Sequence, residues 1–365
     1  MTKFINVSML PAKEGDCLIV EYGDGSSHKH VLIDAGRAWT YEHALKQTLT
    51  ARNIKQLELL VVSHVDRDHI DGMQKLLTDT EIDLTVKEVW FNTYLHLEDK
   101  SLSDEIDEDD VESFSVKMGE YLSTSILKKG WPWNSSFQGK SVKVENATDS
   151  IHLSGLSISL LSPTNEKLSA LKNTWERECE KAGLVPGFGV EDYEALNDDV
   201  ESFDILDIDE LATKPFKGDS AVPNGSSIAF VLDYDNKRVL FAGDAHEDVL
   251  VDEIKALGFS EANKLKLDAF KVSHHGSKAN ISKELLSLVE CKNFLISTNG
   301  NYFKHPNDEA IARIIKFGTP GLTLHFNYNT QHNKHWDKRY YKKEYGYHTK
   351  YPEHDEDGFY SLLID

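Results

Sequence analysis

The segment from His64 to Gly72 constrains the fold of this chain more than any other stretch. Five of its nine side chains can bind a cation: His64, Asp66, Asp68, His69 and Asp71. The segment follows an apolar run at residues 57–63, whose short length and branched side chains are typical of a buried β-strand. Residues 73–78 then have the pattern of a helix. Because α/β folds place functional groups where a strand ends, the segment predicts a site for two metal ions.

Size and composition indicate a folded globular protein. A chain of 365 residues, with 40% hydrophobic and 28% charged residues, can bury a large core. No apolar run approaches the roughly 20 residues that a membrane helix needs, and the first residues lack a signal-peptide pattern. The cysteines, Cys17, Cys179 and Cys291, have no CxxC spacing, which predicts neither a disulfide framework nor a structural zinc site. We therefore expect a cytoplasmic protein.

The formal net charge of −21 disfavours a polyanionic partner. Much of this charge lies in two acidic runs, at residues 98–112 and 191–210, which we expect to be solvated faces. Bound divalent cations would also reverse the sign of the charge at the site itself. Net charge therefore weighs against a nucleic-acid substrate without excluding it.

Strand and helix patterns alternate in two similar halves, which predicts an αββα sandwich with the site along one edge of the paired sheets. We expect one domain at residues 1–325, with insertions at about 95–150 and 165–222, and a C-terminal extension at 326–365. Strands are predicted at residues 4–8, 17–22, 30–33, 57–63, 87–92, 151–153, 156–161, 227–234, 238–242, 269–273, 293–297 and 359–363. Helices are predicted at residues 41–51, 73–78, 166–182, 247–257, 282–289 and 308–317.

The spacing of the motif assigns its side chains to two ions. His64 and Asp66 occupy alternate positions of an extended segment, so both can face one cation. Asp68 and His69 are adjacent and can turn toward a second cation. Asp244, which follows the strand at 238–242, can bridge both ions, because a carboxylate has two oxygens.

We expect His305 to complete the second ion's ligands. The predicted set is rich in oxygen and lacks a thiolate, which favours Mn²⁺ over Zn²⁺.

These motifs carry a family resemblance. The motif from His64 to His69, HxDxDH, resembles the HxHxDH signature of the metallo-β-lactamase superfamily, with Asp66 in place of the second histidine. It is more similar still to the soluble hydrolase domain of the ComEC/Rec2-like competence proteins, over roughly residues 5–325. Further matching elements follow in order: Gly15-Asp16, Asp34-Ala35-Gly36, residues 224–227, Gly243-Asp244, residues 274–277, and residues 301–306 with His305-Pro306.

The resemblance implies a metal-dependent hydrolase, specifically a phosphodiesterase or nuclease that cleaves DNA through a hydroxide activated by two metal ions. Asp68, His274 and His275 are then the catalytic candidates; either histidine could bind a metal or the scissile phosphate, or protonate the leaving group.

Further roles follow from the same resemblance. Ser277 and Asn301 would orient the substrate, and Asp34 would hold a ligand histidine in its tautomer. The chain departs from the superfamily at Ser162, where a further histidine ligand is usual. The first metal site is then open, uses water as a ligand, or recruits His274 or His275.

The ComEC-like domain normally accompanies a membrane channel, whereas a copy without one predicts another context, such as defence against foreign DNA together with a partner protein. Two other functions stay open. One is a hydrolase of a small molecule, such as a cyclic nucleotide, a phosphorylcholine ester or a lactone, which the acidic surface favours. The other is a non-catalytic binding module that metals stabilise. Residues 332–351 either grip a phosphate backbone or form a folded extension, and Trp131 and Trp133 are more typical of local packing.

Overall fold

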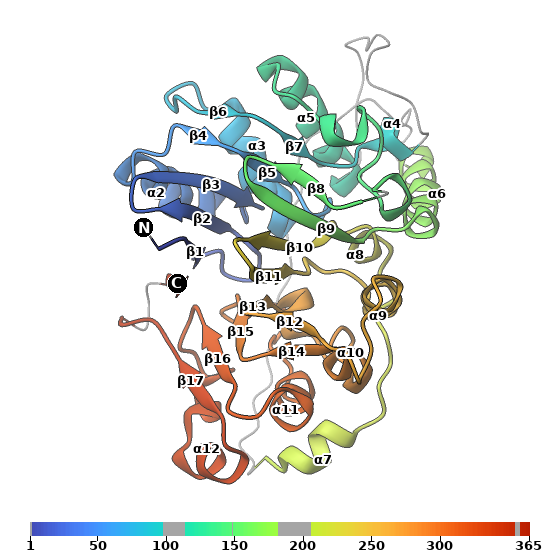
Figure 1. Cartoon of the computed structure of the whole chain (residues 1–365). Helices are drawn as coiled ribbons and strands as arrows, with labels where there is room; N and C mark the ends of the chain where they lie inside the picture. The colour runs from blue at the N-terminus through green and yellow to red at the C-terminus, as the bar shows by residue number, and fades with distance from the viewer. Residues whose placement is uncertain (1, 98–113, 148, 182–205, 355–357) are drawn as a thin grey trace.

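Two β-sheets packed face to face form the centre of the molecule, and helices cover their outer faces (Figure 1). This computed structural model describes residues 2–97, 114–147, 149–181, 206–354 and 358–365. The arrangement is an αββα sandwich, so the predicted fold class is confirmed. No described helix combines the length and the apolar character that crossing a membrane requires.

The first sheet has the strand order β18-β1-β2-β3-β5-β7. Its pairings are antiparallel from β18 to β3 and parallel from β3 to β7. Because β18 pairs with β1, the two ends of the chain lie close together (Figure 1). The strands are β1 (Phe4–Met9), β2 (Leu18–Asp24), β3 (Ser27–Ile33), β5 (Leu59–Val61), β7 (Val89–Trp90) and β18 (Tyr360–Ile364).

The second sheet has the order β17-β16-β15-β13-β11-β10-β9-β8, antiparallel from β8 to β11 and parallel from β11 to β17. Its strands are β8 (Ile151–Leu153), β9 (Leu156–Ser162), β10 (Ala229–Tyr234), β11 (Lys237–Phe241), β13 (Ala269–Lys271), β15 (Asn293–Ile296), β16 (Thr323–Phe326) and β17 (His348–Lys350). Two small parallel pairs join β4 (Gln56–Leu57) to β6 (Thr85–Val86) and β12 (Leu265–Leu267) to β14 (Val289–Cys291).

The helices divide between the two outer faces, and α3 and α5 lie on the first sheet whereas α9, α10 and α11 lie on the second (Figure 1). The α-helices are α1 (Ala38–Thr40), α2 (Lys46–Ala51), α3 (Arg67–Thr78), α4 (Tyr94–Leu97), α5 (Phe114–Lys129), α6 (Asn165–Lys181), α7 (Ile208–Thr213), α8 (Val222–Gly225), α9 (Glu247–Ala256), α10 (Lys283–Leu288), α11 (Asp308–Phe317) and α12 (Arg339–Tyr345). Shorter turns are the π-helix η1 (Tyr41–Leu45) and the 3₁₀ turns η2 (Ser135–Phe137), η3 (Val144–Asn146), η4 (Ser273–Gly276) and η5 (Lys334–Asp337).

Aromatic and branched side chains fill the space between the sheets. Phe230 of β10 is fully buried there, with its ring edge-on to Trp90 of the first sheet at a centroid distance of 5.8 Å. Phe241 of β11 packs against the Phe230 ring, with the two ring centroids 5.6 Å apart. Burying such large apolar surfaces is the dominant stabilising contribution to a sandwich of this kind.

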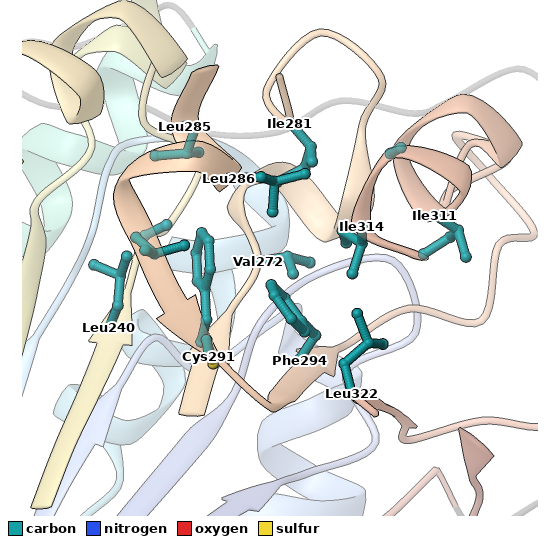
Figure 2. Packing of buried hydrophobic residues seen from close by; sticks show 14 of the residues in the cluster. Leu240, Val272, Ile281, Leu285, Leu286, Cys291, Phe294, Ile311, Ile314 and Leu322 are labelled. Carbon is teal, nitrogen blue, oxygen red and sulfur yellow. The ribbon is translucent and has the colours of Figure 1, made fainter. Parts of the chain in front are cut away.

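A second apolar layer fixes helices on the outer face of the second sheet (Figure 2). There, side chains of the sheet strands pack against α10 and α11, as Phe294 does beneath Ile314. All six residues of α11 from 310 to 315 are buried, and the apolar ones, Ala310, Ile311, Ala312, Ile314 and Ile315, belong to this layer. The helix predicted at 308–317 is therefore stabilised by the core that it covers.

Helix α3 begins earlier than the sequence predicts, at Arg67 rather than at residue 73. Asp66 is its N-cap residue and has extended backbone angles, so Asp68 and His69 lie in the first helical turn and not in a loop. An acidic residue is stabilised in a first turn by the unpaired backbone N–H groups there. The consequence is that the motif is held on a regular element.

The C-terminal residues fold into the domain. Trp336, Tyr341 and Tyr347 are buried in the outer core of the second sheet, so these rings are not exposed to stack on bases. Trp133 is likewise packed, parallel to Phe91. The acidic run at 98–112, and residues 191–205 of the second run, lie outside the described residues.

We expect Phe230→Ala to lower the free energy of unfolding by about 3–5 kcal/mol, because it removes a fully buried ring between the sheets. Urea unfolding followed by tryptophan fluorescence measures the change. Leu363→Ala, at a side chain that is 58% exposed, is the control and should stay within about 0.5 kcal/mol of the wild type. Equal losses in the two variants would contradict this assignment of the core.

Candidate metal centre

The centre lies where strands of both sheets end. Asp34 follows β3 directly, His64 follows β5 after two residues, and Asp244 follows β11. The two halves are joined there by a hydrogen bond from the Ile228 N–H to the Ser63 carbonyl, 2.9 Å long. The fold therefore brings residues about 180 positions apart in the sequence to one edge of the sandwich.

Two glycines allow the backbone segments to approach closely at this edge. A Cβ atom on Gly15 would lie 1.8 Å from the carbonyl oxygen of Asp68, so no other residue fits without movement. Gly243 has a φ of +51° and lies between the side chains of Ser63 and Ser227. Glycine adopts this left-handed conformation without the steric cost that a side chain brings.

The carboxylate of Asp244 lies at the middle of the centre. Its Oδ2 atom is 3.8 Å from His64 Nε2 and 3.6 Å from His69 Nε2. The Nε2 atom of His274 is 3.7 Å from the same oxygen, whereas His275 Nε2 faces the other oxygen, Oδ1, at 3.8 Å. These distances exceed those of hydrogen bonds, but two ligands about 2.1 Å from one ion in tetrahedral geometry lie roughly 3.4 Å apart.

The motif histidines are held through their Nδ1 atoms. His69 Nδ1 lies 2.8 Å from Asp34 Oδ2, and that same oxygen accepts a hydrogen bond from the Ser63 hydroxyl at 2.6 Å. Because the Ser63 hydroxyl donates to Asp34, it can accept from His64 Nδ1 at 3.0 Å. With Nδ1 held in this way, each ring directs Nε2 toward Asp244, where that atom could bind an ion once it has lost its proton.

The two histidines after β13 are held in the same way. His275 Nδ1 lies 2.8 Å from the carbonyl oxygen of Ser297, and His274 Nδ1 lies 3.3 Å from Asp219 Oδ2. Asn224 donates a hydrogen bond to the same oxygen of Asp219, at 2.8 Å. Four imidazoles from two halves of the molecule thus present Nε2 to one carboxylate.

Several of these buried atoms have no hydrogen-bond partner within the part of the chain that the structure describes. They include the Nε2 atoms of His64, His69 and His275 and the Oδ1 atom of Asp244. An unpaired buried polar atom costs about 1–3 kcal/mol, and folded proteins rarely leave several together. A divalent cation would satisfy all of them at once, so the residues fit the ions that the fold implies.

Groups of possible ligand atoms overlap around this point. In the described residues they are His64, His69 and Asp244; Asp68, His69 and His275; Asp16, Asp244 and His275; and Asp16, Asp34 and His69. Asp244 faces different histidines with its two oxygens, which is the arrangement that a bridging carboxylate needs. The predicted Mn²⁺ preference stays a prediction.

Asp16 belongs to these groups although the sequence assigned it no role. Its Oδ2 atom accepts a hydrogen bond of 2.6 Å from Lys271, and its Oδ1 atom lies 3.6 Å from His275 Nδ1. Lys271 and Asp16 are both 1% exposed. This buried contact between an ammonium and a carboxylate holds Asp16 next to the possible ligands.

The charges at the centre are strongly coupled. Burial raises the pKa of Asp68 to about 6, with a smaller contribution from Asp244. Burial alone would raise the pKa of Asp244, but the surrounding imidazoles hold it well below its ordinary value. Burial would lower the pKa of His69, yet the carboxylates of Asp244 and Asp34 raise it well above its ordinary value. A metal ion would therefore displace protons when it binds.

The two histidines after β13 differ in charge. Burial lowers the pKa of His275 well below its ordinary value, so its ring is neutral and can coordinate an ion. Burial would also lower the pKa of His274, but the carboxylates of Asp244 and Asp219 raise it to about 9. His274 is thus a cation beside Asp244 at neutral pH, which suits proton donation.

Other predicted ligands lie at the margin of the centre. Asp66 Oδ2 is 3.5 Å from His64 Nε2, with its side chain 35% exposed. His305 packs its ring edge-on to His274 at a centroid distance of 5.0 Å, outside the ligand groups of the described residues. Burial lowers the pKa of His305 to about 3. Asp71 accepts a hydrogen bond from the Ala38 N–H at 3.0 Å and so supports the backbone.

The predicted substrate residues differ in exposure. Ser277 is buried directly after η4, where its N–H donates to the His274 carbonyl. Asn301 is exposed in the loop before His305. Ser162, at the position where a histidine was expected, ends β9 with a buried hydroxyl that has no hydrogen-bond partner among the described residues.

Comparison with known proteins agrees with this geometry. Residues 161–300 match the model of the metallo-beta-lactamase superfamily, a range that includes Asp244, His274 and His275. The chain is also 21% identical over 370 residues to ComE operon protein 3 of Bacillus subtilis (strain 168). That alignment covers 96% of this chain and 34% of the relative, so the chain spans about a third of that protein's length.

We expect Asp34→Asn to weaken Mn²⁺ binding about 10- to 100-fold, because an amide cannot both orient His69 and accept from Ser63 as the carboxylate does. Asparagine tolerates the φ of +55° at this position, so the backbone should be retained. Isothermal titration with Mn²⁺ measures the affinity. Asp235→Asn, at an exposed carboxylate paired with Lys3, is the matched control. Unchanged affinity in Asp34→Asn would contradict the role given to Asp34.

Proposed function

Because residues 161–300 match the metallo-beta-lactamase superfamily and the chain is similar to ComE operon protein 3, we propose that it is a metal-dependent phosphodiesterase that cleaves DNA. The observation that carries this proposal is the position of Asp244, whose two oxygens face imidazoles from both halves of the molecule. A phosphodiester needs charge compensation on the phosphoryl group and on both the attacking and the leaving oxygens, and two adjacent ions supply it when bound.

The residues of the chain divide into those that hold ions and those that hold these ligands. His64, His69, Asp68, Asp244 and His275 would hold two divalent ions, with Asp66 at the exposed side. Asp34 orients one ligand histidine, and Lys271 keeps Asp16 in place beside another. Neither Cys17 nor Cys291 is among the possible ligand groups of the described residues, and a set of carboxylates and imidazoles supports Mn²⁺ as the proposed ion.

His274 is the proposed proton donor. Its Nδ1 atom is held by Asp219, and its Nε2 atom points at Asp244 in the middle of the centre. Hydrolysis adds water to phosphorus and breaks the bond from phosphorus to the leaving oxygen, which then needs a proton. Nε2 of a protonated His274 can supply that proton, and the negative charge of Asp219 stabilises the ring before transfer. Asp68 is the proposed acceptor of the proton that the water gives up.

The resemblance to competence proteins supports DNA as the substrate, whereas the net charge of −21 supports a small molecule instead. We therefore keep a hydrolase of small phosphodiesters or lactones as the second candidate. The cytoplasmic location, the partner protein and the role in defence stay predictions.

With Mn²⁺ the purified chain should cleave labelled DNA, chelation should abolish cleavage, and added Mn²⁺ should restore it. Asp244→Asn should lower kcat more than about a hundredfold, because it removes the negative charge and one of the two carboxylate oxygens that would hold the ions. Asp235→Asn should match the wild type. Circular dichroism confirms that each variant is folded.

A panel of small phosphodiesters and lactones separates the two candidates. Turnover of a panel member with no cleavage of single- or double-stranded DNA would favour the small-molecule hydrolase. Absence of any turnover in the Mn²⁺-loaded protein would contradict both proposals.

A further inference from the structure

A group of exposed aromatic and half-buried cationic side chains lies beside the metal centre. We call Lys13, Arg37, Trp39, Tyr302 and Phe303 the rim patch. Its three aromatic residues are 39%, 40% and 43% exposed, in the order given. In the described part of the chain only eight large hydrophobic side chains are this exposed, and three of them are here. Such a concentration of exposed rings is typical of a binding surface.

The rim patch is connected to the centre from both halves of the molecule. The Phe303 ring lies nearly parallel to His305, with centroids 6.1 Å apart and planes 24° apart, and His305 in turn contacts His274. From the other half, Arg37 forms an ion pair with Glu14, the neighbour of Gly15. Gly15 packs against the backbone of Asp68. A ligand whose phosphate lies at the centre would therefore have this patch within reach.

The two sides of the rim patch also contact each other. The guanidinium carbon of Arg37 lies 5.7 Å from the Tyr302 ring centroid, although the two residues come from different sheets' loops. The loop that carries Tyr302 is tied to Lys13 by a hydrogen bond of 2.8 Å from the Asn299 N–H to the Lys13 carbonyl. The patch is thus one surface built by three segments of the chain, which carry Lys13, Arg37 with Trp39, and Tyr302 with Phe303.

The rim patch has two cations, Lys13 and Arg37, against one adjacent carboxylate, Glu14, and this balance favours an anionic aromatic ligand. Lys13 Nζ lies 4.1 Å from the Trp39 ring centroid, and Arg37 lies over Tyr302. The rings therefore already have cations beside them, and a quaternary ammonium ligand would meet like charge. A nucleotide instead offers a base to the rings and phosphates to the lysine and arginine.

We propose that Tyr302 and Phe303 stack on an unpaired nucleobase of the strand whose phosphate lies at the metal centre, with Arg37 and Lys13 facing the adjacent phosphates. This inference rests on the proposed function and specifies its substrate as a single strand or an unpaired end. A duplex keeps its bases stacked on each other, so its base faces do not reach the rings.

The test is fluorescence anisotropy of a labelled 12-nucleotide strand with a phosphorothioate backbone, which resists cleavage, on the Mn²⁺-loaded protein. Phe303→Ala and Tyr302→Ala should each weaken binding about 5- to 150-fold, the range that loss of one stacked ring produces. Tyr302→Phe keeps the ring and should bind as the wild type does. Tyr340→Ala, at an exposed ring on α12, is the matched control and should not change binding.

A strand of the same length without bases separates stacking from charge. It should bind the wild type and Phe303→Ala equally, because it has phosphates but nothing to stack. A duplex of the same sequence should bind more weakly than the single strand and should be insensitive to Phe303→Ala. Thermal melts followed by circular dichroism show whether each variant is folded.

The inference is overturned if Phe303→Ala and Tyr302→Ala bind the strand as the wild type does, or if Tyr340→Ala weakens binding as much. A wild type that hydrolyses phosphodiesters yet binds no strand also overturns it. If the protein binds the strand through these rings but leaves a natural DNA backbone intact, the proposed nuclease function fails and the inference stands. Failure of one proposal is therefore distinguishable from failure of the other.

Discussion

The burial of the Asp244 carboxylate among four imidazole nitrogens is the arrangement on which the centre depends. A buried carboxylate is costly unless opposite charges or hydrogen-bond donors surround it. Here the carboxylate oxygens of Asp244 lie 3.6–3.8 Å from the Nε2 atoms of His64, His69, His274 and His275. These distances are too long for good hydrogen bonds, but they are short enough for the oxygens and nitrogens to bind ions between them. Protons on His69 and His274 balance part of the charge in the metal-free protein, and binding of ions would release protons from such groups.

The sandwich supplies the rigidity that this arrangement requires. Strand ends from both sheets deliver the ligands, and acceptors at the next layer hold each Nδ1 atom: Ser63, Asp34, Asp219 and the carbonyl of Ser297. Three of these four acceptors, all except Ser63, lie on a different segment of the chain from the histidine that they hold. The orientation of the rings is thus a property of the assembled fold and not of either half.

The sequence predicted the parts of this structure that depend on local pattern. Alternating and apolar runs identified most strands, and the polar residues that follow them identified the edge where the site lies. The bounds of α11 were correct because its start, its end and its apolar face all agree. The start of α3 was misplaced, because its first turn consists of polar residues such as Asp68 and His69. That turn therefore lacks the apolar spacing by which a helix is recognised in a sequence.

Contacts between distant segments could not be read from pattern. Lys271 and Asp16 are 255 positions apart, and nothing near either residue indicates that they pair. The same is true of Asp219, which lies 55 positions before His274, and of Arg37 with Tyr302. Gly15-Asp16 did stand out as a matching motif, but its contact with Asp68 appears only once the loop that carries it packs against the start of α3.

The central claim is that Asp244 bridges two ions, and anomalous diffraction from crystals grown with Mn²⁺ tests it most directly. The account predicts two anomalous peaks about 3.5–4 Å apart, one bound by Oδ1 of Asp244 and the other by Oδ2. The Nε2 atoms of His64, His69 and His275 should be among the remaining ligands. A single peak, or two peaks that Asp244 does not bind, would contradict the account.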